Sequence, residues 1–230
     1  MLQSLAQWSS RPPPADVAFI AAAAAWIGDV ESEFLDRIWA GFERLRTSSA
    51  VFDGSDLERS ITQLLSAAID DLVAGEAPYY VQHGPYERET MLAPPAQPPA
   101  YDLAFVWRAN PRVMWPAEAK VLNSSSALAE YLADVRDQYL TCRYAPFSAS
   151  GAMLGYLLHG EPTDALANIG LRLGASFAEE GPIDPNRPHR STVHGRTVPL
   201  GKPYPTPFRC HHMLLRFHGL ERHRTASAFR

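Results

Sequence analysis

The chain has 230 residues, 46% of them hydrophobic, so it is neither an intrinsically disordered protein nor a small fold that needs disulfides for stability. Its two cysteines, Cys142 and Cys210, form neither a disulfide framework nor a C-x-x-C metal motif, which predicts a reducing, cytoplasmic environment. The net charge of −4 is untypical of a protein that binds nucleic acid over its whole surface.

The N-terminal segment is predicted to be helical. Residues 15–46 fit one or two helices, broken or bent near Gly28, because apolar residues recur there at spacings of three and four. We expect this apolar face to dock on the core or to pair with a second copy or a partner subunit. The apolar run of residues 17–27 is too short to span a bilayer, so no membrane association is predicted. A single basic residue, Arg11, precedes that run, which favours a helix over a secretory signal.

The rest of the chain alternates helix-like and strand-like patterns. Residues 94–99 contain four prolines and are predicted to form a loop, and Pro-, His- and Arg-rich loops are predicted after Gly181. The expected helices lie near residues 55–74, 127–141 and 164–176, and the expected strands near residues 79–89, 102–108, 113–122, 151–158 and 208–217.

Lys120 is one of two lysines in a chain with 19 arginines, and it lies two residues after Glu118. A lysine kept in such a chain indicates a site that needs a compact, movable ammonium rather than a planar guanidinium. Side chains alternate along a strand, so Glu118 and Lys120 point to the same face. If the hairpin is symmetric about Asn110, Asp102 lies opposite Glu118, with the two Cβ atoms roughly 4.5–5.5 Å apart.

Two carboxylates at that distance raise each other's pKa unless a cation lies between them. Mg²⁺ or Mn²⁺ suits such an oxygen-rich pair, and the backbone carbonyl of Ala119 would add a further oxygen. Lys120 would then lie beside a metal-bound water. This combination of residues predicts hydrolysis of a phosphodiester, in which the metal activates water and the lysine stabilises charge. The alternative is that Asp102 and Glu118 are exposed strand charges.

With Asp102 followed by Glu118-Ala119-Lys120 on this order of elements, residues 55–160 resemble the PD-(D/E)xK nuclease superfamily. The resemblance implies that Asp102 and Glu118 are metal ligands, that Lys120 is the catalytic lysine and that Glu58 on the first helix joins the metal site. Two features depart from the pattern. Tyr101, not proline, precedes the aspartate, and the helix after the motif lacks the Gln-x-x-x-Tyr of the RecB-type branch.

Other residues have both a functional and a structural interpretation. Glu58 also fits a capping box with Ser55. Gln138 and Tyr131, seven residues apart on one helix face, either line the cleft and contact nucleic acid or belong to its rim. In the C-terminal part, His194 and Arg196 are candidates for the cleft.

Charge is distributed unevenly. Residues 186–230 contain nine Arg or Lys and one acid, whereas residues 1–185 contain twelve and twenty-four. This asymmetry predicts a basic lobe that tracks phosphates beside an acidic, metal-binding half. Six of the eight histidines are also in the basic segment, but no spacing there is typical of a tetrahedral zinc site, and His211 and His212 are expected on opposite faces of a strand.

The resemblance predicts an α/β fold with a restriction-endonuclease-like core, in which helices flank a central mixed sheet. Residues 1–50 would form an N-terminal helical segment, residues 51–160 the nuclease-like core, and residues 161–230 a helix plus basic C-terminal strands that complete the same domain. The implied activity is Mg²⁺- or Mn²⁺-dependent cleavage of nucleic acid, of DNA rather than RNA, in restriction, phage defence or repair. The alternatives are a non-catalytic nucleic-acid-binding or assembly subunit with this fold, and a plain interaction module.

Overall fold

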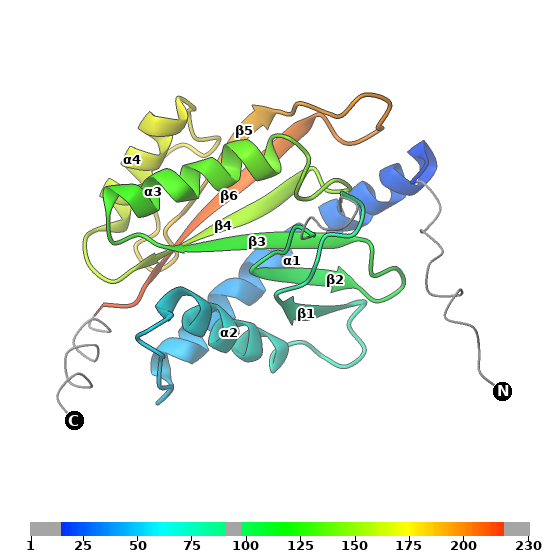
Figure 1. The fold of residues 1–230 in the computed structure, drawn as a ribbon. Coiled ribbons are helices and arrows are strands. Elements are labelled where there is room, and N and C mark those ends of the chain that lie inside the picture. Colours follow the sequence, from blue (N-terminus) through cyan, green and yellow to red (C-terminus); the bar gives the residue numbers. More distant parts are fainter. Residues whose placement is uncertain (1–14, 91–97, 219–230) are drawn as a thin grey trace.

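The computed structural model describes residues 15–90 and 98–218, which form an α/β structure around one six-stranded mixed sheet (Figure 1). The strand order is β1-β2-β3-β4-β6-β5. Strands β1, β2 and β3 pair antiparallel in succession, β4 pairs in parallel with β3 and β6, and β5 pairs antiparallel with β6. The elements are α1 (Val17–Thr47), α2 (Leu57–Asp70), β1 (Tyr79–His83), β2 (Leu103–Trp107), β3 (Met114–Val121), α3 (Ser125–Ala133), the π-helix η2 (Asp134–Tyr139), β4 (Ser150–Leu157), α4 (Pro162–Leu173), β5 (His189–Gly195) and β6 (Pro207–Arg216).

Helices cover both faces of the sheet, as predicted (Figure 1). The sheet divides the core into two clusters because side chains alternate along each strand. Phe34 of α1 packs with Trp115 in the cluster on the α1 and α2 side. Tyr131 of α3 and Met153 of β4 belong to the cluster on the α3 and α4 side. A mixed sheet with helices on both faces confirms the predicted α/β class.

The N-terminal segment is a single helix, which confirms the first of the two predicted arrangements, and the helix is not broken at Gly28. Helix α1 has 31 residues and begins after Asp16, whose side chain accepts a hydrogen bond from the N–H of Phe19 at 2.7 Å. Phe34 is fully buried and stacks on Phe105, with ring centroids 4.4 Å apart. The predicted docking on the core is therefore confirmed, and this apolar face is already covered by the chain's own sheet.

Three local predictions differ from the structure. Helix α2 begins at Leu57 with Asp56 as its N-cap, so the capping box of Ser55 with Glu58 does not form. The helix predicted at residues 127–141 is α3 followed by the π-helix η2. Strand β5 replaces a predicted loop, because a polar edge strand lacks the apolar pattern by which strands are recognised. The predicted proline loop falls largely outside the described residues.

Within residues 15–90 and 98–218, no helix is long and apolar enough to cross a membrane. Cys142 and Cys210 are buried free thiols.

Candidate active site

The hairpin of β2 and β3 brings Asp102 and Glu118 together. Leu103 pairs with Ala117, and the same register continued by one residue places Asp102 opposite Glu118, as predicted from symmetry about Asn110. The backbone N–H of Asp102 donates to Glu118 Oε1 at 3.3 Å. The register explains the contact, because directly opposed residues of antiparallel strands are nearest neighbours.

The carboxylate of Asp102 is held by the neighbouring strand. The N–H of Ala119 donates to Asp102 Oδ2 at 2.8 Å. Ala119 was predicted to offer its carbonyl to a metal, but the contact that the structure gives it with this pair is made through its N–H. Among the described residues, neither Asp102 Oδ1 nor Glu118 Oε2 takes part in a hydrogen bond. Each carboxylate therefore has one oxygen held by the backbone and a second for another ligand.

Lys120 lies between two further carboxylates at the end of β3. Its Nζ is 3.2 Å from Glu58 Oε1 and 3.4 Å from Asp134 Oδ2. Glu58 also accepts a hydrogen bond from the N–H of Val121 through Oε2, at 2.9 Å. Both oxygens of Glu58 are thus engaged, and its observed role is to hold the end of β3 and the lysine. Its predicted role as a metal ligand is not supported by these contacts.

The electrostatics of this group are dominated by an excess of negative charge. Burial raises the pKa of Glu118 well above its ordinary value, and Asp102 and Asp134 raise it further. Burial also raises the pKa values of Glu58 and Asp134. For Lys120, burial alone would lower the pKa, but the surrounding carboxylates, Glu58 and Asp134 first, raise it above the ordinary lysine value. The lysine is therefore a fixed cation among four acids.

The donor set fits a divalent ion only in part. Within the part of the chain that the structure describes, no three or more His, Cys, Asp or Glu side chains are grouped so that they could hold a metal ion. The pair of Asp102 and Glu118 supplies hard oxygen donors, which Mg²⁺ and Mn²⁺ prefer. The three-carboxylate site that included Glu58 is not formed.

Three other residues that were predicted to line the cleft or contact nucleic acid have their polar contacts outside the group of Asp102, Glu118 and Lys120. Tyr131 is fully buried, and its hydroxyl lies 2.8 Å from His212 Nδ1, so it is a core residue and does not line a surface cleft. Arg196 is also buried and donates to three backbone carbonyls. His194, on edge strand β5, is hydrogen-bonded to Thr192. Each of these side chains is engaged elsewhere in the chain, and a role of the three residues in contacting nucleic acid stays a prediction.

Gln138 and Asp134 both lie on the π-helix η2. The side-chain oxygen Oε1 of Gln138 is buried and has no hydrogen-bond partner in the described chain. Asp134 was not recognised from the sequence, although it is the residue that meets Lys120 from the α3 side. The available signal was its place on the helix after the Glu-x-Lys strand, three residues after Tyr131 and so on the helix face that had been singled out.

Four of the cations predicted to form a basic lobe, Arg187, Lys202, Arg209 and Arg216, are paired in the described residues with acids from earlier in the chain. Arg187 pairs with Asp36 at 3.0 Å, and Lys202 pairs with Glu89 at 3.2 Å. Strands β5 and β6 belong to the same sheet as the other four, in line with the prediction that the C-terminal strands complete the domain. Three more C-terminal arginines, Arg222, Arg224 and Arg230, lie outside the described residues.

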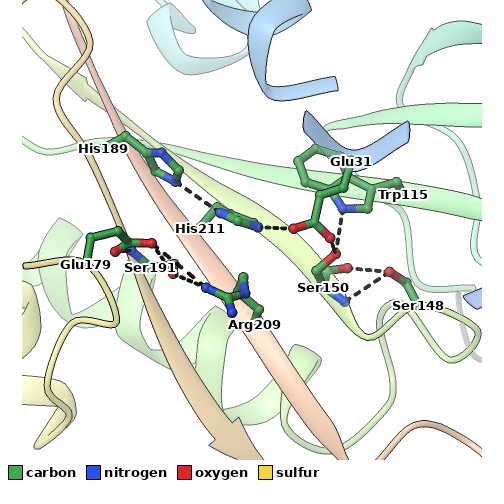
Figure 2. Close-up of polar contacts among 9 residues, drawn as sticks. All are labelled: Glu31, Trp115, Ser148, Ser150, Glu179, His189, Ser191, Arg209 and His211. Carbon is green, nitrogen blue, oxygen red and sulfur yellow. Dashed lines mark hydrogen bonds and ion pairs between the residues drawn. The ribbon is translucent and has the colours of Figure 1, made fainter. Parts of the chain in front are cut away.

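A second polar network lies on the α1 side of the sheet (Figure 2). Glu31 of α1 accepts hydrogen bonds from Ser150 Oγ and from His211 Nε2, the latter at 2.8 Å. Trp115 Nε1 donates to Ser150 Oγ at 2.9 Å, and His189 Nε2 lies 3.0 Å from His211 Nδ1. We assign this network a structural role, because its members satisfy one another and join α1 to four strands.

His211 and His212 lie on opposite faces of β6, as predicted, since His211 contacts Glu31 of α1 and His212 contacts Tyr131 of α3. Comparisons with models of protein families, with curated proteins and with solved structures found no match.

Proposed function

We propose that this protein is a divalent-metal-dependent nuclease with a restriction-endonuclease-like core, and that Asp102, Glu118 and Lys120 form its active site. The observation that carries the proposal is the hairpin register, in which Leu103 pairs with Ala117 and Asp102 therefore meets Glu118, two residues before Lys120. The order of helix, three antiparallel strands, helix and parallel strand supports it.

Asp102 and Glu118 would hold Mg²⁺ or Mn²⁺ through the oxygens that the backbone does not occupy. When bound, the metal would polarise a water molecule and stabilise negative charge on the phosphate. No third side-chain ligand is present among the described residues, so water and substrate oxygens would complete the coordination sphere, as is common for Mg²⁺. Burial, and then repulsion from Asp102 and Asp134, raises the pKa of Glu118, and binding a cation would relieve that repulsion.

Lys120 would serve as a fixed positive charge rather than as a base. The neighbouring carboxylates raise its pKa, so it stays protonated at neutral pH. An ammonium held at the strand end by Glu58 can stabilise charge that develops on a phosphate or orient the attacking water. General-base catalysis by the neutral amine is disfavoured by the same carboxylates.

The substrate class follows from the chemistry of the site together with the resemblance. A phosphodiester suits a metal held by two carboxylates beside a lysine, and DNA is the preferred nucleic acid. The acidic surroundings repel phosphate until a cation binds, which makes the proposed activity strictly metal-dependent.

The test is a cleavage assay on duplex DNA, single-stranded DNA and RNA, with Mg²⁺, with Mn²⁺ and with a chelator. Asp102→Asn and Lys120→Ala are expected to abolish cleavage while the thermal midpoint stays within a few degrees of wild type. Lys202→Ala is the matched control, because Lys202 is the chain's other lysine and pairs with Glu89 away from this site. Equal rates in wild type and in the Asp102 and Lys120 variants would overturn the proposal, as would no cleavage of any substrate.

A non-catalytic nucleic-acid-binding or assembly subunit is the second candidate. It is favoured by one observation, that the Lys120 amine is already within ion-pair distance of two carboxylates. For that function, binding to DNA should weaken with salt but should not respond to chelation or to Asp102→Asn.

A further inference from the structure

We propose that Asp134, at the junction of α3 and the π-helix η2, is a positioning residue for Lys120. The inference rests on the proposed function for the role of Lys120. It adds a residue that the Asp…Glu-x-Lys pattern does not contain.

The ammonium of Lys120 is held from both faces of the sheet. Glu58 belongs to α2 on the α1 side, and Asp134 belongs to η2 on the opposite side. Their oxygens lie 3.2 and 3.4 Å from Nζ. A lysine has a flexible four-carbon stem, so a single partner leaves the ammonium free to swing about that contact. Two partners on opposite sides fix its position.

Asp134 is costly as a purely structural residue. Its Oδ2 is buried and, apart from the ion pair with Lys120, has no hydrogen-bond partner in the described chain. A buried carboxylate oxygen without hydrogen bonds destabilises a fold, and a neutral side chain would fill the same space at lower cost. The ion pair with Lys120 is the interaction that offsets this loss of stability.

The backbone that carries Asp134 is itself unusual. Asp134 is the first residue of η2, a π-helix of six residues that directly continues α3. π-helices are rare and occur frequently at functional sites, because the wider turn changes the direction of the side chains that follow. Asp134 lies at this junction: its N–H still bonds to the carbonyl of Glu130 on α3, and the π-helix begins at the residue that meets the lysine.

The decisive variant is Asp134→Asn, which removes the charge and keeps the shape. We expect kcat for metal-dependent cleavage to fall on the order of 10- to 100-fold, since misplacing a catalytic group by about 1 Å has an effect of that size. KM for DNA should stay the same or fall, because a negative charge near the phosphate is lost. Asp134→Glu, which keeps the carboxylate, should recover part of kcat. Asp137→Asn is the matched control, because Asp137 lies on the same π-helix but is exposed.

A second readout does not require activity. The chain has two lysines, so acylation of Lys120 can be measured by mass spectrometry against Lys202 in the same sample at one fixed pH. Asp134→Asn should raise the ratio of Lys120 to Lys202 labelling several-fold, and Asp137→Asn should leave the ratio unchanged. If Asp134→Asn does not fold, Asp134→Ser replaces it.

The outcomes separate the two proposals. Absence of cleavage by wild type would defeat the proposed nuclease function, while the labelling ratio would still test whether Asp134 holds Lys120. A folded Asp134→Asn protein with unchanged kcat and an unchanged labelling ratio would overturn the positioning role and leave the nuclease function standing.

Discussion

The backbone N–H of Ala119 donates a hydrogen bond to the carboxylate of Asp102 at 2.8 Å. The Asp102 side chain therefore lies beside β3 at the position where a further residue of β2 would lie if that strand were longer. Strand β2 pairs with β3 from Met114 to Ala117, whereas the pairing of β3 with β4 runs from Ala117 to Val121. The C-terminal end of β3 is therefore paired with β4 along one edge but is not paired with β2 along the other. The candidate site occupies this edge, because a short strand beside a longer one leaves backbone groups that side chains can meet.

Glu118→Gln is expected to stabilise the metal-free protein, and more so at pH 8 than at pH 5. Burial and the nearby Asp102 and Asp134 raise the pKa of Glu118 in the folded state. The stability that this carboxyl contributes is therefore fully present below its unfolded pKa and is lost as the pH rises through its folded pKa. Glutamine does not ionise, so the variant should exceed wild type by about 1–2 kcal/mol at pH 8, measured by urea unfolding.

The matched control for that experiment is Glu130→Gln, because Glu130 is an exposed carboxylate on α3. Its free energy of unfolding should stay within about 0.5 kcal/mol of wild type at both pH values. Added Mg²⁺ should stabilise wild type and the control but not Glu118→Gln. A loss of stability in Glu118→Gln at pH 8 would contradict the buried, destabilised carboxylate described above.

Two glycines of α1 are expected to respond in opposite ways to the same substitution. A Cβ at Gly41 would lie 2.4 Å from Ile69 Cγ1 and 3.3 Å from the backbone nitrogen of Ile69, so α2 would have to shift. Gly41→Ala should destabilise the protein by about 1–3 kcal/mol. At Gly28 a Cβ would meet nothing within 4 Å, and Gly28→Ala should stabilise by about 1 kcal/mol through helix propensity.

Thermal unfolding of both variants gives the comparison directly, and similar effects of the two substitutions would contradict close packing of α1 on α2. Helix α2 also carries Glu58, which holds Lys120. Gly41→Ala is therefore expected to lower the proposed nuclease activity beyond its effect on stability, whereas Gly28→Ala should leave that activity at the wild-type level.

The sequence predicted the hairpin and its register because both are local. Asn110 and Pro111 mark the turn, and a symmetric hairpin then fixes which residues of the two strands are opposed. The alternation that puts Glu118 and Lys120 on one face follows from strand geometry alone. These short-range rules were sufficient to place the acid pair.

The parts that could not be predicted depend on long-range packing or on departures from regular geometry. Glu31 and His211 meet across 180 positions of sequence, and neither lies in a recognisable motif. Asp134 on the helical segment after β3 meets Lys120 only because that segment packs over the end of β3, which local sequence patterns do not show. The sequence gives charge only by position along the chain, so it could not show that the fold pairs Lys202 of the basic segment with Glu89.

Arg196→Leu is expected to destabilise the protein by about 3 kcal/mol. The guanidinium donates to the carbonyls of Tyr139, Ser148 and Tyr144 at 2.8, 2.9 and 2.7 Å. Removing it breaks three buried hydrogen bonds at about 1 kcal/mol each, and within the described residues only the carbonyl of Tyr139 keeps another donor, the N–H of Cys142. Arg196→Lys should also destabilise, because an ammonium cannot match the planar fork that reaches all three carbonyls.

This experiment also separates structure from nucleic-acid contact at Arg196. Urea unfolding gives the stability, and the salt dependence of DNA binding gives the number of phosphate contacts. The folded Arg196→Lys protein should keep the salt dependence of wild type. Exposed Arg143, replaced by alanine, is the control for stability and should change it by less than about 0.5 kcal/mol. A stable Arg196→Leu variant with a reduced salt dependence would assign the residue to the substrate instead.

The protein is expected to lose stability as the pH falls from about 6.5 towards 4, and His189 is one cause. Its Nε2 lies 3.0 Å from His211 Nδ1, and His211 Nε2 faces the carboxylate of Glu31 at 2.8 Å (Figure 2). When both imidazoles are neutral, His211 donates to Glu31 and accepts from His189. Two protonated rings would bring two hydrogens into the same gap, so the folded pair resists a second proton.

Burial, reinforced by His211, lowers the pKa of His189 from 6.5 to about 4. The unfolded chain therefore takes up this proton first as the pH falls, and the stability present above pH 6.5 is lost progressively until about pH 4. A shift of this size corresponds to about 3 kcal/mol.

His189→Gln keeps an N–H for His211 but does not titrate, so its free energy of unfolding should vary less over this window. Some slope should remain, because burial also lowers the pKa of His212 to about 3. His218→Gln, at an exposed histidine, should retain the full wild-type slope, and an unchanged slope in His189→Gln would remove the histidine pair as its source.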